Sequence, residues 1–468
     1  MLYILLILRK LFGFIISLII VKNSISLNKD IPWIVLVLLF PFLGFLIYFI
    51  LGSNVIRSSL LENISETFRK SKEYFVQDVR LRNEILKNDN KALIYLSEYS
   101  NYPISKRNKV VYYATGEVFF EQVKSELKTA EKFIFIEFFS IEMGVLWEEI
   151  LDILKEKIKL GVEVRLIYDN MACKRKIPFK YYEVLESYGI MCEPFYKNCS
   201  LIGMIKNHHE HRKGIIIDGR IAFTGGINIE DRYVNLEQPY GYWKDVGISI
   251  EGEGVWNFTV MFLGMWNAFR KTDEDYMKYY NNLIGKFDSG GYVVAFGNNP
   301  LDQEMVGKNV YINMINQARK YLYIFTPYLI IDMDMDNALV LAAKRGVEVK
   351  IIIPGIPDKK LVYQVSLLNA RKLIKNKVKV YTYSPGFMHG KVFLMDDKIA
   401  MVGTMNTDYR SLYLDFEYGV LMEGVNAIED IKHDVEDTLK KSVEIKLTKI
   451  NFIQSLWEAI LQLLAPLM

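Results

Sequence analysis

The chain has 468 residues, with 58 basic and 55 acidic side chains, a net charge of +3 and a mean hydropathy of +0.10. Three cysteines without a CxxC pair exclude a disulfide-rich secreted fold and a zinc ribbon, and a hydrophobic content of 51% excludes a disordered chain. The nearly balanced charge argues against a dedicated nucleic-acid binder, so we expect no nucleic-acid partner.

Residues 1–52 contain much of the apolar excess and are predicted to form a membrane region of one or two transmembrane helices. The stretch Trp33–Leu51 carries no charge and is about as long as a helix that spans a ~30 Å hydrocarbon core. The stretch Leu2–Val21 is also apolar but contains Arg9 and Lys10. A second span, an interfacial helix and a signal sequence therefore stay open for it.

Residues 53–107 are predicted to be a helical juxtamembrane linker whose charges bear on the orientation in the membrane. More basic residues follow the second apolar stretch than lie between the two stretches: Arg57, Arg69, Lys70 and Lys72 against Lys22 and Lys29. The positive-inside rule then predicts a multi-pass protein with a cytoplasmic C-terminal part and an outward-facing loop between the stretches.

From about residue 108 onward, the chain alternates short apolar runs with helical patterns. The runs 133–139 and 164–168 are typical of buried strands, and a helical stretch at 145–160 lies between them. This order is typical of a parallel β-α-β unit. It recurs with strands at 321–330 and 349–354 around a helix at 337–345. We therefore predict an α/β fold built from a repeat.

Two copies of the pattern His-x-Lys-x4-Asp strengthen the repeat. An asparagine follows each of the two histidines at the same offset, 228 − 211 in one copy and 406 − 389 in the other. The chain has only five histidines, for which ~0.07 chance matches are expected. The candidate residues are His211, Lys213, Asp218 and Asn228 in the first copy and His389, Lys391, Asp396 and Asn406 in the second.

The first motif copy also predicts its own local structure. Apolar residues on both sides of Asp218 and Gly219 indicate a β-hairpin with a tight turn. Histidine and lysine at alternate positions of a strand point to the same face, so one strand from each repeat would bring two imidazoles and two ammonium groups to one cleft. For the turn aspartate, a turn former that also pairs with a basic side chain is preferred over a catalytic group.

Two imidazoles and two ammonium groups, without a carboxylate cluster for a metal, suit a tetrahedral anion. One neutral histidine can attack phosphorus and form a phosphohistidine, while the other, protonated, gives a proton to the leaving oxygen. The lysines and asparagines would hold the non-bridging oxygens as negative charge shifts onto them. A carboxylate would fix each imidazole tautomer, and sequence order assigns Asp245 to His211 and Glu417 to His389.

The run His208, His209, Glu210 and His211 offers a competing interpretation as a metal site. Its spacing does not match HExxH, and adjacent residues on a strand point to opposite faces, so we expect no metal. His208 and His209 are instead predicted to lie at the rim of the phosphate site. The sequence also has no P-loop and no strand followed by GxGxxG, and we expect no cofactor.

The two motifs resemble the signature of the phospholipase D superfamily, and within it the chain is similar to the bacterial cardiolipin synthases. The segments that carry the likeness are GVEVRLIYDN, HRKGIIIDGRIAFTGGINIEDRY, YWKDVGISIEGEGV, GVEVKIIIPG, HGKVFLMDDKIAMVGTMNTDYRSLYLDFE and LLAPLM. The resemblance implies two similar lobes with mixed β-sheets flanked by helices, related by a pseudo-two-fold axis and sharing one active site. We place the lobes at residues 108–290 and 291–445, followed by an amphipathic tail at 446–468.

The resemblance also implies a reaction, in which a phosphatidyl group passes from one phosphatidylglycerol to another and glycerol is released. By motif position, His211 matches the nucleophile and His389 the general acid and base. The remaining matches are phosphate-holding Lys213, Lys391, Asn228 and Asn406, histidine-orienting Asp245 and Glu417, and the motif residues Asp218 and Asp396. The implied partners are phosphatidylglycerol, other phospholipids and the bacterial cytoplasmic membrane, and a homodimer stays open.

Three other functions stay open on the sequence alone. They are a phospholipase D-type hydrolase, a synthase that uses phosphatidylethanolamine as donor, and a non-catalytic scaffold tethered to the membrane. The chain also departs from the family pattern in the His-His-Glu run before the first motif and in Asp415, where the family more often has asparagine. These departures leave the lipid preference open.

Overall fold

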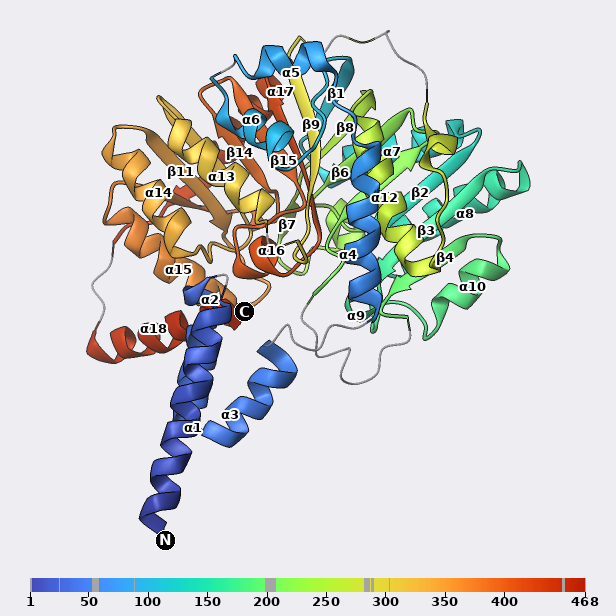
Figure 1. Ribbon diagram of the computed structural model, residues 1–468. Helices are drawn as coiled ribbons and strands as arrows, with labels where there is room; N and C mark the ends of the chain where they lie inside the picture. The colour runs from blue at the N-terminus through green and yellow to red at the C-terminus, as the bar shows by residue number, and fades with distance from the viewer. Residues whose placement is uncertain are drawn as a thin grey trace.

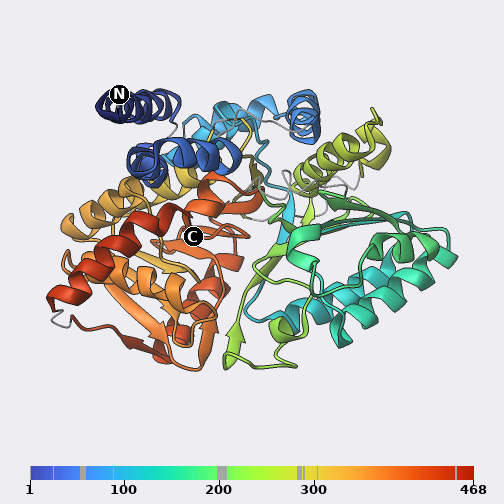
Figure 2. The same cartoon turned by 90° about the horizontal axis from the view of Figure 1, so that it is seen from below.

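The computed structural model describes residues 2–24, 26–52, 59–87, 89–197, 208–281, 287, 290–302, 304–447 and 451–467. Two α/β lobes lie side by side, and the N-terminal helices project from the body that the lobes form (Figures 1 and 2). Arg57, one of the basic residues used for the orientation, and Cys199 lie outside the described residues.

The first lobe contains a seven-stranded sheet in the order β1-β8-β6-β5-β2-β3-β4. Its strands are β1 (Asn108–Tyr113), β2 (Phe133–Phe138), β3 (Glu163–Asp169), β4 (Met191–Phe195), β5 (Lys213–Ile217), β6 (Ile221–Gly225) and β8 (Gly247–Gly252). The strands β2, β3 and β4 are parallel and the others pair antiparallel, so the sheet is mixed. The lobe's helices include α7 (Gly116–Thr129), α8 (Val145–Lys159) and α10 (Tyr181–Ser187).

The second lobe repeats this topology and adds one strand, in the order β9-β16-β15-β14-β10-β11-β12-β17. Its strands are β9 (Tyr292–Asn298), β10 (Tyr321–Phe325), β11 (Glu348–Pro354), β12 (Lys379–Tyr383), β14 (Val392–Met395), β15 (Ile399–Gly403), β16 (Glu417–Glu423) and β17 (Ser442–Glu444). Its helices are α13 (Val306–Gln317), α14 (Met333–Lys344), α15 (Lys360–Ile374), α16 (Tyr409–Tyr413) and α17 (Ala427–Lys440). The two equivalent strand orders confirm the predicted α/β fold of two similar lobes.

The β-α-β units form where the apolar runs predict them, with one strand shorter than expected. The strand predicted at 321–330 ends at Phe325, because Pro327 has no N–H for the ladder and restricts the residue before it. The predicted boundary between the lobes, at residues 290 and 291, falls just before β9, the first strand of the second sheet.

A shared hydrophobic core joins the lobes. Helix α12 (Val255–Arg270) is buried almost all round, as its apolar sequence on every face requires, and its core cluster includes side chains from both sheets. The short strands β7 (Tyr242–Lys244) and β13 (Gly386–Met388) also pair in parallel between the lobes. The predicted linker folds onto this body through α4 (Ser59–Ser71), α5 (Val79–Ile85) and α6 (Lys91–Glu98), with α4 against α12 and α6 against α13.

The prediction of one continuous span over Trp33–Leu51 is wrong. The chain forms α2 (Leu27–Leu39), breaks at Phe40 (φ −129°, ψ 73°), and continues as α3 (Pro41–Ile47) and a π-helical turn, Tyr48–Gly52. Pro41 causes the break because it lacks an N–H and disfavours helical backbone at the preceding residue. The two helices fold closely together: a Cβ on Gly44 would lie 2.6 Å from the Leu36 carbonyl oxygen.

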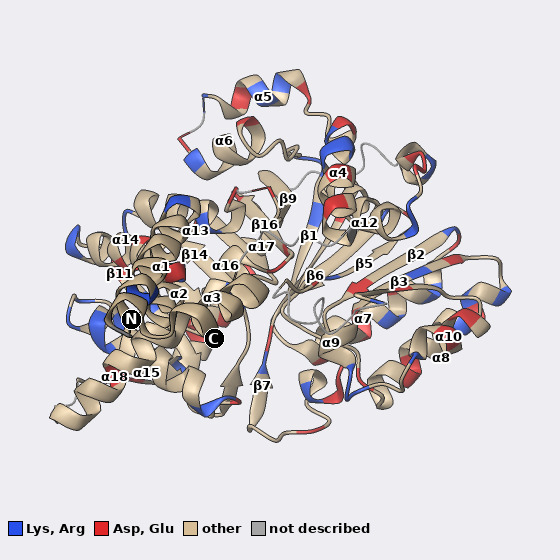
Figure 3. Ribbon diagram, turned by 60° about the horizontal axis from the view of Figure 1, so that its bottom comes forward, with Lys and Arg blue, Asp and Glu red and all other residues tan. Residues whose placement is uncertain are grey.

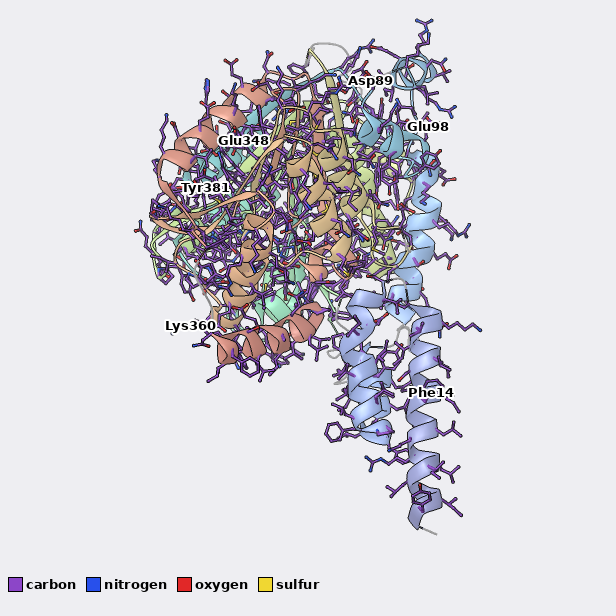
Figure 4. The ribbon with its side chains drawn as sticks, turned by 90° about the vertical axis from the view of Figure 1, so that its left-hand side faces the viewer. Phe14, Asp89, Glu98, Glu348, Lys360 and Tyr381 are labelled. Atoms are coloured by element: carbon purple, nitrogen blue, oxygen red, sulfur yellow. The ribbon has the colours of Figure 1, made fainter. Side chains whose placement is uncertain are left out.

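Helix α1 (Leu2–Asn23) is instead the segment that could span a membrane. Among the described residues, Tyr3–Asn23 is the one helix long and apolar enough for this. Helices α1, α2 and α3 project from the body, with Phe14 on the projecting part of α1 (Figure 4). The structure thus provides one helix of spanning length where a multi-pass arrangement was expected. The start of α2 lies at the body, where the Ser26 hydroxyl hydrogen-bonds to Tyr413 of α16.

The C-terminal tail forms helix α18 (Phe452–Leu464), which lies crosswise to α1 along the lower edge of the body (Figures 1 and 4). Its polar side chains face the protein: Glu458 pairs with Arg371 of α15, and Lys372 donates to Gln462 at 2.8 Å. Leu461 is buried against the body, whereas most of the other apolar residues are exposed, with Phe452 83% exposed. The helix therefore has a side bound to the body and an exposed apolar side.

Candidate active site

Each motif histidine lies just before the central strand of its lobe and is held by the other lobe. The His211 backbone N–H donates to the Phe416 carbonyl at 3.0 Å, and the His389 N–H donates to the Lys244 carbonyl at 2.7 Å. The first contact belongs to an isolated parallel bridge, and the second follows the parallel pairing of β7 with β13. Equivalent backbone hydrogen bonds thus bring the two motifs together across the interface between the lobes.

The carboxylate partners cross between the lobes, so the pairing assigned by sequence order is wrong. His211 Nδ1 lies 2.8 Å from Glu417 Oε1, and His389 Nδ1 lies 2.6 Å from Asp245 Oδ2. Both carboxylates are fully buried. The reason for the crossing is local: each carboxylate directly follows the residue whose carbonyl accepts the histidine N–H from the other lobe.

The two carboxylates are held in different ways. Glu417 also accepts a hydrogen bond from the hydroxyl of Thr404, at the end of β15. Asp245 accepts the backbone N–H of Val246 at 2.8 Å. Gly226, which is equivalent to Thr404 in the repeat, leaves room for Asp245, because a Cβ there would lie 2.2 Å from Oδ1 of that carboxylate. The equivalence itself is readable from the sequence, since both positions follow the motif histidine at the same offset (226 − 211 and 404 − 389).

The two motif lysines are buried beside the histidines. Lys213 Nζ donates to the His211 carbonyl at 2.7 Å, and Lys391 Nζ lies 3.2 Å from His389 Nε2. Burial lowers the pKa of Lys213 to about 7 and that of Lys391 to about 8. The ammonium groups are therefore poorly solvated, and a bound anion would stabilise their charge in place of water.

The pKa of both motif histidines is lowered, which favours the neutral imidazole. Burial and the Lys391 charge lower the pKa of His389 to about 4. Burial and the charges of Lys213 and Lys391 hold the pKa of His211 well below its usual range. Since lysines of both lobes act on His211, the two motifs form one electrostatic unit.

The carboxylates differ in charge state as well as in support. Burial opposes ionisation of Asp245, but its interactions with His389 and Lys391 outweigh burial and lower the pKa of that carboxyl. Burial raises the pKa of Glu417 well above its usual range. Asp245 is therefore the carboxylate that can stabilise an imidazolium.

Asn228 and Asn406 are buried, and one end of each amide has no hydrogen-bond partner in the described structure. The other end of the Asn228 amide bonds to the Tyr233 hydroxyl at 2.7 Å. A buried amide end without a partner is costly unless a ligand satisfies it. The unpartnered atom is Oδ1 in both amides, which accepts a hydrogen bond and therefore suits a donor rather than an ionised phosphate oxygen, so the phosphate-holding role of the two asparagines stays a prediction.

Asp218 and Asp396 lie at the far end of the motif strands. Five residues of β5 at ~3.3 Å each separate Lys213 from Asp218 by roughly 16 Å. The predicted tight turn is present, with φ of 54° at Asp218 and 60° at Gly219. The predicted basic partner is not what the carboxylate binds, because it accepts the backbone N–H groups of residues 131–133. Asp396 accepts those of residues 319–321 in the same way.

Aromatic side chains that sequence reasoning missed flank both histidines. The Phe139 ring lies 4.6 Å from His211, and the rings of Tyr233 and Trp243 lie 5.2 and 5.3 Å from His389. Tyr233 and Trp243 follow the first motif in the sequence, but they contact the histidine of the second. Sequence position is therefore at most a weak signal for these aromatic neighbours. The described residues contain no group of three or more histidine, cysteine or acidic side chains that could hold a metal ion.

Comparison with known proteins places this geometry in a family. The family model "Cardiolipin synthase, PLD-like domain" matches residues 123–242 and 311–439. The chain is 32% identical to a cardiolipin synthase of Staphylococcus aureus (strain Mu50), over 99% of this chain and 95% of that protein. It is 40% identical to an uncharacterised protein of Streptococcus mutans serotype c, over 96% and 98% of the two chains.

The fold is also that of a solved structure, the phosphatidylserine synthase of Haemophilus influenzae Rd KW20. The TM-score is 0.59 at 16% identity, and the likeness covers 81% of this chain and 98% of that one. These matches confirm the resemblance indicated by the two motifs. The chain belongs to the cardiolipin synthases of the phospholipase D superfamily, which are phosphatidyltransferases of phospholipid biosynthesis.

Proposed function

We propose that the protein joins two phosphatidylglycerol molecules into cardiolipin and glycerol through a phosphohistidine on His211. The observation that carries the proposal is the crossed arrangement, in which two His–carboxylate pairs and two buried lysines meet at the interface between the lobes. The assignment of His211 as nucleophile follows its motif position, and its lowered pKa keeps the imidazole neutral, with one ring nitrogen free to attack.

In the first step, His211 Nε2 attacks the phosphorus of the donor lipid. The P–N bond forms as the bond between phosphorus and the headgroup oxygen breaks, and His389 gives its proton to that oxygen so that glycerol leaves. His389 can carry that proton because the negative charges of the bound phosphodiester and of the ionised Asp245 both raise its pKa. Lys213 and Lys391 hold the non-bridging oxygens.

In the second step, a glycerol hydroxyl of the acceptor lipid gives its proton to His389 and attacks phosphorus. The P–N bond breaks, His211 is regenerated, and the two lipids are joined. One phosphodiester replaces another, so the reaction needs no nucleotide. Water in place of the acceptor would give phosphatidic acid, which is the hydrolase alternative.

We further propose that α1 crosses the bacterial cytoplasmic membrane once, with the catalytic body on the cytoplasmic side. Its 22 residues span roughly 33 Å, and its apolar side chains are uncovered: Tyr3 is 77% exposed. Phe42 at the start of α3 is 64% exposed, which suits a hairpin of α2 and α3 that dips into the bilayer. Charges are sparse on these helices and common on the body (Figure 3). The outward apolar side of α18 would lie in the interface.

A lipid assay tests the proposed function. Purified protein in vesicles of phosphatidylglycerol alone, with EDTA and without CTP, is expected to release equal amounts of cardiolipin and glycerol. Phosphatidic acid as the sole product would identify a hydrolase. Labelled phosphatidylethanolamine added to the same vesicles tests that lipid as donor. A complete lack of turnover would favour the scaffold.

A further inference from the structure

The chain segment before β5 carries a third side chain toward the cleft. The backbone is extended there, because the His209 carbonyl accepts the Phe416 N–H while the His211 N–H donates to the Phe416 carbonyl. Side chains two residues apart in such a segment lie on the same side. His209 therefore stands in one row with His211 and Lys213.

The intervening residues confirm this alternation. Glu210 and Arg212 pair with each other at 2.6 Å, and Arg212 also lies 3.2 Å from Glu137. All three side chains are buried on the opposite side of the segment from the row. The row is thus His209, His211 and Lys213, at alternate positions.

The second lobe has no equivalent of His209. The position that matches it in the repeat, two before His389, is Phe387, whose ring is buried 4.5 Å from that of Trp243. The row in the second lobe is therefore phenylalanine, histidine and lysine. His209 is an additional imidazole on one side of an otherwise repeated site.

His209 is held with one nitrogen left for a ligand. Its Nδ1 lies 2.8 Å from Oδ2 of the fully buried Asp169, and its ring meets the edge of Phe139, which also contacts His211. The side chain is 25% exposed, and Nε2 has no hydrogen-bond partner in the described part of the chain. Burial opposes protonation of His209, but the charge and hydrogen bond of Asp169 raise its pKa above the ordinary value.

We propose that His209 binds the phosphate of the acceptor lipid, which makes it a specificity-determining residue for the second step. This inference rests on the proposed function. Cardiolipin carries two phosphodiesters joined by one glycerol, so the acceptor phosphate must lie one glycerol length from the reacting phosphorus. A step of two residues along an extended chain is ~7 Å, which is comparable to that bridge. The Nε2–H of a protonated His209 would give the phosphate a charge-assisted hydrogen bond.

The proposed role of His209 can be tested by comparing two acceptor molecules that react with the same phosphohistidine, one with a phosphate and one without. Cardiolipin formation uses an acceptor with a phosphate, whereas exchange of the headgroup with isotope-labelled free glycerol uses the same donor step and an acceptor without one. In His209→Gln, the ratio of cardiolipin formation to glycerol exchange is expected to fall 10- to 100-fold. His209→Arg keeps a cationic donor and is expected to restore the ratio.

His208→Gln is the matched control, since His208 is the adjacent residue and its Nδ1 bonds the Leu414 carbonyl at 2.7 Å. Its ratio is expected to equal that of the wild type, even if its total activity falls. An unchanged ratio in His209→Gln, or an equal fall in both reactions, would overturn this inference alone. A wild-type protein that makes only phosphatidic acid would overturn the proposed function and this inference with it.

Discussion

The two halves of the active site share a backbone arrangement and differ in what surrounds it. Each half has a histidine, a lysine two positions later, an asparagine at a shared offset and a carboxylate from the opposite lobe. Around His211 the neighbours are Glu417 with its threonine hydroxyl, and the Phe139 ring, which also contacts His209. Around His389 they are Asp245 and aromatic rings. The repeat thus provides the framework, while residues outside the motif distinguish the roles.

Replacing the two histidines is expected to give the largest effects and to separate their roles. His211→Asn and His389→Asn should each lower cardiolipin synthesis by at least ~10⁴-fold, because each removes an essential group. His389→Asn should still form the phosphatidyl adduct on His211, slowly, since the nucleophile is intact. Acid-labile label from phosphate-labelled lipid measures it. An adduct in His211→Asn but not in His389→Asn would reverse the assignment.

Replacing each carboxylate by its amide tests the crossed pairing. Each replacement should lower the rate of cardiolipin synthesis by ~10²- to 10⁴-fold, as the loss of a tautomer-fixing acid does in other His-dependent enzymes. Glu417→Gln should slow adduct formation, because it acts through His211. Asp245→Asn should weaken proton transfer through His389, and so reduce both glycerol release and adduct breakdown. Rapid-quench measurement of the adduct separates the two. Effects exchanged between the variants would favour the pairing given by sequence order.

The pH dependence of kcat/KM tests the shared electrostatics of the two motifs, and we expect effects of intermediate size. The pKa of the nucleophile His211 is held well below its ordinary value of 6.5 by burial and the lysine charges, so protonation should stop its attack on phosphorus only well below that pH. The lysine pKa values are also lowered, so phosphate binding should fall as pH rises through 7 to 8. The profile of kcat/KM against pH on short-chain phosphatidylglycerol shows both limbs. A basic limb near 10 would contradict the burial of the lysines.

The smallest effects are expected where the halves are most alike. Asp218→Asn and Asp396→Asn each weaken a carboxylate that accepts three backbone N–H groups, and should cost ~1–3 kcal/mol of stability. Denaturant unfolding measures this, and the two losses should agree. The ratio of cardiolipin to phosphatidic acid should stay near that of the wild type. A large change in this ratio would show that the turn aspartates act in catalysis.

The sequence predicted what depends on local geometry. His211, Lys213, His389 and Lys391 were found because the motif repeats and because alternate residues of a strand share a face. The turn at Asp218 was found because Asp-Gly favours positive φ. The β-α-β units were found because buried strands and amphipathic helices have different periods.

The remainder depends on contacts across the fold, to which sequence order is not a guide. The crossed pairing follows from β7 lying against β13 in the other lobe, and nothing near Asp245 in the sequence indicates it. The backbone N–H groups that donate to the Asp218 carboxylate lie about 85 residues earlier in the sequence. The break at Phe40 has a local signal in Pro41, which disfavours helical backbone at the residue before it.

The crossed hydrogen bonds also mean that neither lobe holds its own catalytic histidine alone. Both histidines depend on the opposite lobe for their carboxylate and for the carbonyl that accepts their backbone N–H. Neither lobe by itself would therefore orient its imidazole, and the same packing of the two lobes completes both the nucleophile and the proton donor.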